Sequence, residues 1–150
     1  TTYDELENKI AEIQNSFDDT AAKLKTAEKQ LSDVSILRKH LRTYQTLRPV
    51  YAEYKKAKNK PEFEKQHRRE LTLYNASRKY LSDVQNGGKL PSLEKVNTDF
   101  TELSDKKRSL YEKYKKERKA LSEIDIIKKN VDMMLGEIRH IGRDNETEIE

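Results

Sequence analysis

The fold is decided by residues 93–142, which read LEKVNTDFTELSDKKRSLYEKYKKERKALSEIDIIKKNVDMMLGEIRHIG. Alternate steps of three and four residues along this stretch trace a heptad seam that is apolar at nearly every position. Its members are Leu93, Val96, Phe100, Leu103, Lys107, Leu110, Tyr114, Glu117, Leu121, Ile124, Lys128, Val131, Leu135 and Ile138. A single helix of this length, about 75 Å, cannot bury its seam against itself. The rest of the chain is therefore expected to cover it.

The composition favours a thin helical core. Charged residues make up 39% of the 150-residue chain and hydrophobic residues 33%, which leaves too few apolar side chains for a thick globular interior. No alternating β-branched run predicts a strand. Because the apolar residues of the seam are periodic rather than scattered, we expect an ordered all-α chain two or three helices wide. Its length suits one domain.

A first long helix is predicted over residues 2–48. Thr2 and Glu5 have the spacing of a capping box at its start, and a second heptad seam follows them. Pro49 lacks a backbone donor and crowds the turn before it, so the helix should stop or kink near Arg48.

Two shorter helices are predicted over residues 50–58 and 61–85, and a final long helix over residues 92–141. Pro61 suits the first position of a helix. Asn86-Gly87-Gly88 has the composition of a helix end followed by a loop.

We expect these helices to form one coiled-coil domain over residues 1–142, followed by a disordered tail over residues 143–150. The nearly equal lengths of the two long helices favour an elongated antiparallel coiled-coil hairpin with the middle helices packed as a helical tip. The competing architecture is a kinked three-helix bundle whose projecting ends dimerise with a second copy. Because the chain starts without methionine, directly inside a helix, we interpret it as a piece of a longer protein.

Charge is distributed unevenly along the chain. Residues 1–36 hold four Lys/Arg against eight Asp/Glu, a net charge of −4, whereas residues 37–90 hold fourteen against five, a net charge of +9. Residues 91–150 hold thirteen against fourteen, a net charge of −1, but residues 106–119 carry eight basic side chains against two glutamates. Both basic clusters are expected to lie toward the tip, where they would attract a phosphate backbone.

Two lysine-rich segments, residues 47–58 and 107–118, resemble each other in the placement of tyrosines among lysine pairs. Such tyrosines can stack on bases while the lysines hold phosphates. The alternative is that the tyrosines belong to the core and that lysine-rich helices repeat by chance. The sequence leaves both interpretations open.

No constellation of residues predicts catalysis. The chain has no cysteine, and His40, His67 and His140 lie in no metal-ligand spacing. No phosphate-binding loop motif and no nucleophile elbow occur, no apolar run approaches the ~18 residues of a membrane span, and we expect no signal peptide. We expect a non-enzymatic, cytoplasmic chain without metal, cofactor, small-molecule substrate or membrane insertion.

The middle of the chain resembles the helical region that follows the nuclease domain of relaxases, the mobilization nucleases of plasmids and integrative conjugative elements in Gram-positive bacteria. The resemblance covers roughly residues 38–135. It rests on Tyr51-x-x-Tyr54-Lys55-Lys56-Ala57-Lys58, Phe63, His67-Arg68-Arg69-Glu70-Leu71-x-Leu73-Tyr74-x-Ala76, Tyr80-Leu81, Leu90-Pro91-Ser92, Leu110-Tyr111 and Lys129-Asn130-Val131-Asp132. It implies a role in conjugative DNA processing. The family's catalytic tyrosine and histidine cluster have no counterpart here, so the chain would be a non-catalytic C-terminal arm.

Three hypotheses for the function remain. The first is a relaxase arm that contacts the DNA backbone without sequence preference. The second is a protein-interaction or dimerisation coiled coil that joins a second relaxase or a component of the conjugation machinery, and the third is a generic coiled-coil spacer. The residues that the first hypothesis assigns to DNA phosphates are Arg48, Lys55, Lys56, Arg68, Arg69, Lys107, Arg108, Lys115 and Lys116.

Overall fold

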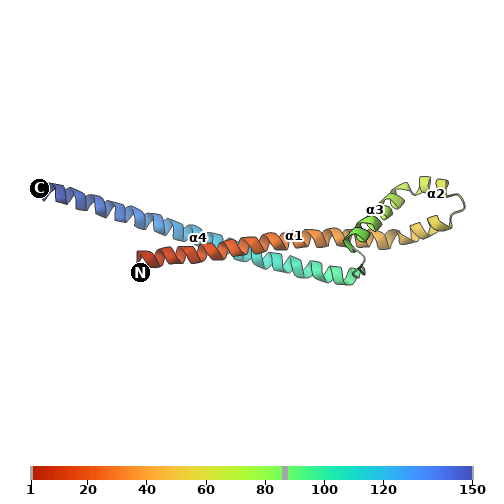
Figure 1. The fold of residues 1–150 in the computed structure, drawn as a ribbon, viewed down its shortest axis with the longest axis horizontal. Helices are drawn as coiled ribbons and strands as arrows, with labels where there is room; N and C mark the ends of the chain where they lie inside the picture. Colours follow the sequence, from red (N-terminus) through yellow and green to blue (C-terminus); the bar gives the residue numbers. More distant parts are fainter. Residues whose placement is uncertain (1, 86–87, 150) are drawn as a thin grey trace. The chain divides into compact units, whose positions relative to one another are not determined.

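The computed structural model describes residues 2–85 and 88–149, with side chains as far as Gly142. Within these residues the chain is all-α, without strands, and the two long helices pack against each other, which confirms the predicted fold class. Figure 1 shows the helices, whose bounds are α1 (Tyr3–Lys56), α2 (Lys60–Gln66), α3 (Arg68–Gln85) and α4 (Leu93–Ile149).

The chain divides into two compact units, which we describe separately. The two-helix unit comprises Thr1–Thr26 of the α1 side and Lys107–Glu150 of the α4 side. The bundle unit comprises Ala27–Lys106 and contains the rest of both long helices together with α2 and α3.

In the two-helix unit, α1 and α4 pack antiparallel. The Tyr3 hydroxyl donates a hydrogen bond of 2.7 Å to Asp132, whereas further along α1 the ring of Phe17 stacks on Tyr114 with 5.0 Å between centroids. Residue numbers therefore rise along one helix as they fall along the other. Figure 1 shows the final turns of α4 extending past the first turn of α1.

A polar pair lies inside this two-helix seam. Thr20 is fully buried, and its hydroxyl donates a hydrogen bond of 2.7 Å to Glu117. Burial alone would raise the pKa of Glu117, but the hydrogen bond from Thr20 and the charge of Lys113 outweigh it and lower the pKa below its ordinary value. The Glu117 carboxylate is therefore held charged in a seam that is otherwise mostly apolar.

In the bundle unit, α3 returns along the last part of α1 and joins it through stacked rings. Tyr74 of α3 stacks on both Tyr44 and Tyr51 of α1, at centroid distances of 5.3 and 4.5 Å. Further along α3, the ring of Tyr80 stacks on that of His40 in α1, with 4.1 Å between the ring centroids. These offset contacts each add about 0.5–1.5 kcal/mol beyond the area they bury, so they hold the α1–α3 pair together along its length.

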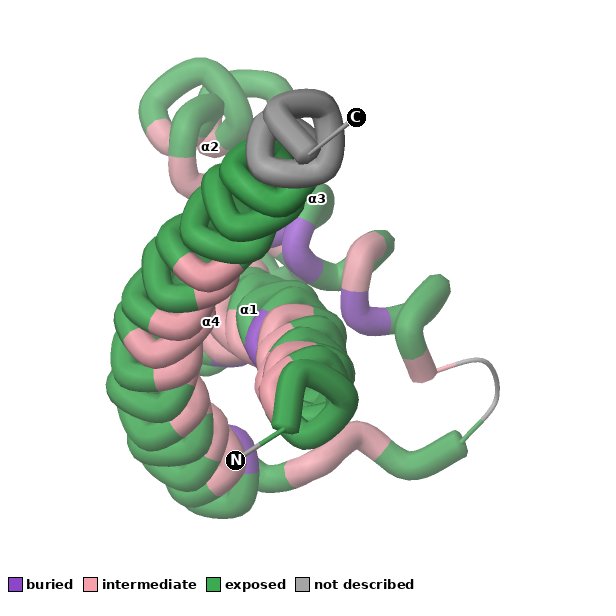
Figure 2. Tube along the Cα trace, turned by 90° about the vertical axis from the view of Figure 1, so that its left-hand side faces the viewer, coloured by how far each residue is buried: buried purple, intermediate pink, exposed green. Residues whose placement is uncertain are grey.

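The hydrophobic core lies where the start of α4 joins this pair. Leu41 of α1, Leu81 of α3 and Val96 of α4 pack together and retain 2–3% exposure. Figure 2 shows the buried positions as isolated patches among intermediate and exposed ones along the helices. The three helices thus bury these three side chains almost completely.

The first helix does not end where the sequence predicts. α1 runs through Pro49 to Lys56, so the separate helix expected over residues 50–58 is part of it. The reason is tertiary packing, because Tyr44 and Tyr51 bind the same ring of α3 from opposite sides of the proline. That packing outweighs the lost donor, which on its own disfavours a helix interior.

The helix predicted over residues 61–85 is two helices. α2 begins after Asn59, whose side chain accepts from the Glu62 backbone N–H at 3.2 Å, and Pro61 lies in its first turn as predicted. His67 ends α2, with its N–H on the Phe63 carbonyl at 2.9 Å, and its own carbonyl accepts from Leu71 in α3. The chain therefore turns at His67 with little loss of backbone hydrogen bonding.

The bounds of α4 also differ from those predicted. Ser92 caps its start, accepting from the Lys95 backbone N–H at 3.1 Å, but the helix continues past Gly142 to Ile149, over the tail expected to be disordered. One glycine costs only about 1 kcal/mol in a helix interior and does not end it. The loop predicted at Asn86-Gly87 lies outside the described residues.

Candidate nucleic-acid interface

Five of the residues that the sequence assigns to DNA belong to the bundle unit, and we name them the tip cluster. They come from the end of α1 and the first turn of α3, on either side of α2, and all are exposed. The tip cluster consists of Arg48, Lys55, Lys56, Arg68 and Arg69.

The tip cluster is not neutralised by neighbouring acids. In the part of the chain that the structure describes, none of its five side chains forms an ion pair. Residues 48–69 hold eight Lys/Arg against three Asp/Glu, a net charge of +5. One of those acids, Glu64, already accepts a hydrogen bond of 2.5 Å from Tyr54. A basic surface whose side chains form no ion pairs with acids attracts an anionic backbone.

The tyrosines near the cluster are occupied by packing. Tyr51 stacks on Tyr74 and accepts a hydrogen bond of 3.1 Å from Arg78, while Lys55 lies over its ring at 4.9 Å. Tyr54 contacts Phe63 as well as Glu64. The interpretation of these tyrosines as core residues is therefore favoured over base stacking.

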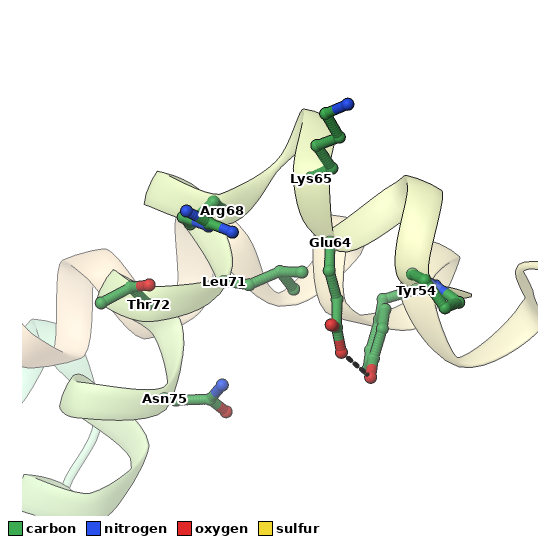
Figure 3. Close-up of a pocket in the computed structure, with 8 residues that line it drawn as sticks. Tyr54, Glu64, Lys65, Arg68, Leu71, Thr72 and Asn75 are labelled. Atoms are coloured by element: carbon green, nitrogen blue, oxygen red, sulfur yellow. Dashed lines mark hydrogen bonds between the residues drawn. The ribbon is translucent and has the colours of Figure 1, made fainter. Parts of the chain in front are cut away.

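A shallow open groove runs beside the cluster, between α2, α3 and the end of α1. Its volume is about 480 Å³, and it is lined by Tyr54, Pro61, Glu64, Lys65, Arg68, Leu71, Thr72 and Asn75. Figure 3 shows Leu71 extending toward the hydrogen-bonded Tyr54 and Glu64, and Lys65 pointing away from that pair. The sequence reasoning missed Lys65, although its place in the most basic segment of the chain was a signal for it.

The other four predicted DNA residues, Lys107, Arg108, Lys115 and Lys116, belong to the two-helix unit. Lys115 pairs with Glu112 at 2.9 Å and lies over the Tyr111 ring at 5.0 Å. We name these four residues the α4 cluster. The two clusters belong to different units.

The expectation that both clusters lie at the tip stays a prediction, because the two clusters belong to different units. Because α3 returns along α1, α4 starts beside Leu41, where Val96 packs, instead of beside the end of α1. The α4 cluster lies in the segment of α4 whose Tyr114 stacks on Phe17. The part of α1 in the same unit is acidic, with three Lys against six Asp/Glu over residues 1–26, a net charge of −3.

The described residues contain no candidate metal site and no candidate membrane span. They include no group of three or more His, Asp or Glu side chains arranged to share a metal ion. No helix among them has an apolar stretch long enough to cross a membrane.

Comparison with protein-family models, with curated proteins and with solved structures gives no match to this chain.

Proposed function

We propose that the chain is a DNA-contacting arm whose tip cluster binds the phosphate backbone without sequence preference. The observation that supports it is the set of five exposed cations, at the end of α1 and the start of α3, that form no ion pair within the described residues. Lys and Arg side chains in this state release counterions when they meet phosphates, which drives nonspecific binding. The packed tyrosines leave phosphate contact, and not base stacking, as the mode of binding.

The resemblance to the helical region of relaxases supports DNA as the polyanion. On this proposal the chain works in the cytoplasm as a non-catalytic arm in conjugative DNA mobilization, and the nicking reaction belongs to a nuclease domain outside it. We assign the α4 cluster a smaller contribution to DNA binding, because Lys115 already forms an ion pair with Glu112.

Charge reversal at Arg68 and Arg69 tests the proposal without threatening the fold. Both lie in the first turn of α3, where acidic side chains complement the positive end of the helix dipole. We expect the Arg68→Glu/Arg69→Glu variant to lose binding to labelled single- and double-stranded oligonucleotides in fluorescence anisotropy. The salt dependence between ~50 and ~200 mM should also become shallower, by about one unit of log–log slope for each lost contact.

Reversal at Lys9 and Lys25 of α1 is the matched control. Both residues are exposed, and their reversal changes the net charge by the same amount. This variant should keep most of the binding if the tip cluster is the site. Equal losses in both variants would contradict a tip site, and absence of wild-type binding at the lower salt would refute the DNA function itself.

A second candidate function, a protein-interaction coiled coil, is favoured by a different observation. Large apolar side chains remain exposed along the last part of α4. The most exposed of them are Ile126, Ile127, Met133, Met134, Ile138 and Ile141. Clusters of this kind mark interaction surfaces.

A further inference from the structure

The groove beside the tip cluster is formed by three helices of one unit. Its lining residues come from the end of α1, from α2 and from the first half of α3, all within the bundle unit. Its volume of about 480 Å³ lies in the range of ligand pockets, about 300–1,000 Å³. Arg68 lines the groove and also belongs to the tip cluster. A strand whose phosphates contact the tip cluster therefore runs next to the groove.

The lining of the groove combines apolar, polar and cationic groups. Leu71, which is 7% exposed, and Pro61 supply apolar surface. Thr72 and Asn75 follow Arg68 at spacings of four and seven residues, so these three side chains lie on one face of α3. A nucleotide has apolar ring faces, a hydrogen-bonding base edge and an anionic phosphate. The lining offers a matching group to each of these parts.

Glu64 brings a carboxylate into the groove. The Tyr54 hydroxyl donates a hydrogen bond of 2.5 Å to its Oε1, which Figure 3 shows as a dashed line. This hydrogen bond, followed by burial, raises the pKa of Tyr54, so the phenol keeps the proton that it donates. Within the described residues, Oε2 of Glu64 has no hydrogen-bond or ion-pair partner. One carboxylate oxygen is therefore fixed by Tyr54, and the other can accept from a ligand.

A carboxylate distinguishes bases by their donors, because it only accepts hydrogen bonds. Cytosine, adenine and guanine carry an exocyclic amino group, and acceptance from the cytosine amino group by Glu or Asp is a common contact in DNA recognition. Thymine has no amino group, and its one N–H lies between two carbonyl oxygens that repel a carboxylate. In a duplex the amino groups are already base-paired, and taking a base out costs a few kcal/mol. The groove therefore suits an unpaired base.

We propose that the groove binds one unpaired base of a DNA strand and favours bases with an exocyclic amino group, which donates to Glu64. The inference rests on the proposed function, because the tip cluster holds the strand by its phosphates. It adds to that function a base preference at one position, whereas the tip cluster itself binds any sequence. DNA is favoured over a peptide as the ligand because Arg68 joins the groove to the phosphate-binding surface.

Two homopolymeric probes of equal length test the preference. Oligo(dC) and oligo(dT) carry the same phosphates and both hold pyrimidines, so they differ mainly in the amino group. In fluorescence anisotropy at mildly alkaline pH, where cytosine strands stay unfolded, we expect oligo(dC) to bind about three- to tenfold more tightly. Equal affinities, or a preference for oligo(dT), would overturn the base site.

The Glu64→Gln variant assigns the preference to the carboxylate. Because an amide both donates and accepts, this variant should bind the two probes with nearly equal affinity and should bind oligo(dT) at least as well as the wild-type chain does. Glu62→Gln is the matched control, since Glu62 is exposed on the same helix, contacts Gln66 and does not line the groove. It changes the net charge equally and should keep the preference. If both variants keep the preference, or both lose it, Glu64 is not the selecting group.

Tyr54 is a positioning residue in this proposal. Tyr54→Phe keeps the ring that contacts Phe63 but removes the hydroxyl that fixes Glu64. We expect this variant to bind oligo(dT) as the wild-type chain does and to show a smaller preference for oligo(dC). A merely structural role would weaken both probes alike or leave both unchanged, and either result would overturn the positioning role.

Unlabelled deoxycytidine monophosphate distinguishes a strand from a free nucleotide as the ligand. It should fail to displace labelled oligo(dC) at concentrations at which unlabelled oligo(dC) does so, because it has no further phosphates for the tip cluster. Complete displacement at those concentrations would overturn the strand as the ligand. If both probes bind equally, the base site fails and the DNA function stands. If neither probe binds at low salt, the DNA function fails, and the base site fails with it.

Discussion

The bundle unit and the two-helix unit are built from the same two long helices, yet they bury their seams differently. In the bundle unit α3 adds a third side, and Leu81 and Val96 retain 2% exposure. In the two-helix unit the corresponding seam residues Leu121 and Val131 are half-exposed. Two helices bury single seam positions such as Thr20 and Leu24, whereas the third helix adds a cluster of buried side chains around Leu81.

The two units also differ in how they fix their register. The bundle unit uses shape, through the rings of Tyr44, Tyr51 and Tyr74. The two-helix unit uses polarity, through the hydrogen bond between Thr20 and Glu117. A buried polar pair is a known way to specify alignment in coiled coils at some loss of stability.

The largest expected effect comes from the bundle core. Leu81→Ala should lower the free energy of unfolding by about 2–5 kcal/mol, because it leaves a cavity among three helices. Leu121→Ala, the same substitution in the half-exposed seam, should cost clearly less. Thermal and urea unfolding followed by circular dichroism measures both, and equal losses would contradict the difference drawn between the units.

Replacing Pro49 sharpens the same comparison. Pro49→Ala restores a backbone donor inside α1 and should raise the free energy of unfolding by up to about 3 kcal/mol, less the lost rigidity of the unfolded chain. A variant that is less stable than the wild-type chain would contradict this expectation. Urea unfolding distinguishes the two signs.

The polar pair is expected to have an intermediate effect. Thr20→Val leaves the Glu117 carboxylate without its donor and should cost about 1–3 kcal/mol. The double variant Thr20→Val/Glu117→Leu should cost less than the sum of the two single changes, since it removes both polar groups together. Additive losses in this double-mutant cycle would show that the pair does not act as a unit.

The smallest expected effect is a pH dependence in the bundle unit. Burial, followed by the charge of Lys39, lowers the pKa of His40 below its ordinary value. The unfolded chain then binds a proton at a higher pH than the folded chain, so stability should decrease as pH falls below the ordinary histidine pKa of about 6.5. His40→Gln should flatten this decrease between pH ~7 and ~5.5, and a wild-type slope in that variant would contradict the assignment.

Periodicity allowed the long helices and their pairing to be predicted, because a heptad seam is a property of local sequence. The capping box at Thr2 was also predictable, and the structure contains both of its hydrogen bonds. The continuity of α1 through Pro49 was not, since it depends on a ring of α3 that is distant in the sequence. The turn at His67 likewise carries no glycine or proline signal.

The candidate site, like the fold, could be predicted from the sequence only where it depends on neighbouring residues. Counting charges located the tip cluster, because its residues are near in sequence. It could not give the point at which α4 starts beside α1. That starting point is fixed by Val96 packing on Leu41 and Leu81, which no local pattern reveals.

The rings that hold α1 to α3 also make the chain report on its own unfolding. There is no tryptophan, so the intrinsic ultraviolet fluorescence comes from tyrosine alone. Tyr44, Tyr51, Tyr54, Tyr74 and Tyr80 belong to the bundle unit, whereas Tyr3, Tyr111 and Tyr114 belong to the two-helix unit. The near-ultraviolet signal of the tyrosines therefore reports mainly on the bundle unit. The far-ultraviolet signal of the backbone reports on both units, in proportion to their helix content. Two non-coincident melting curves from one unlabelled sample would show that the units unfold separately.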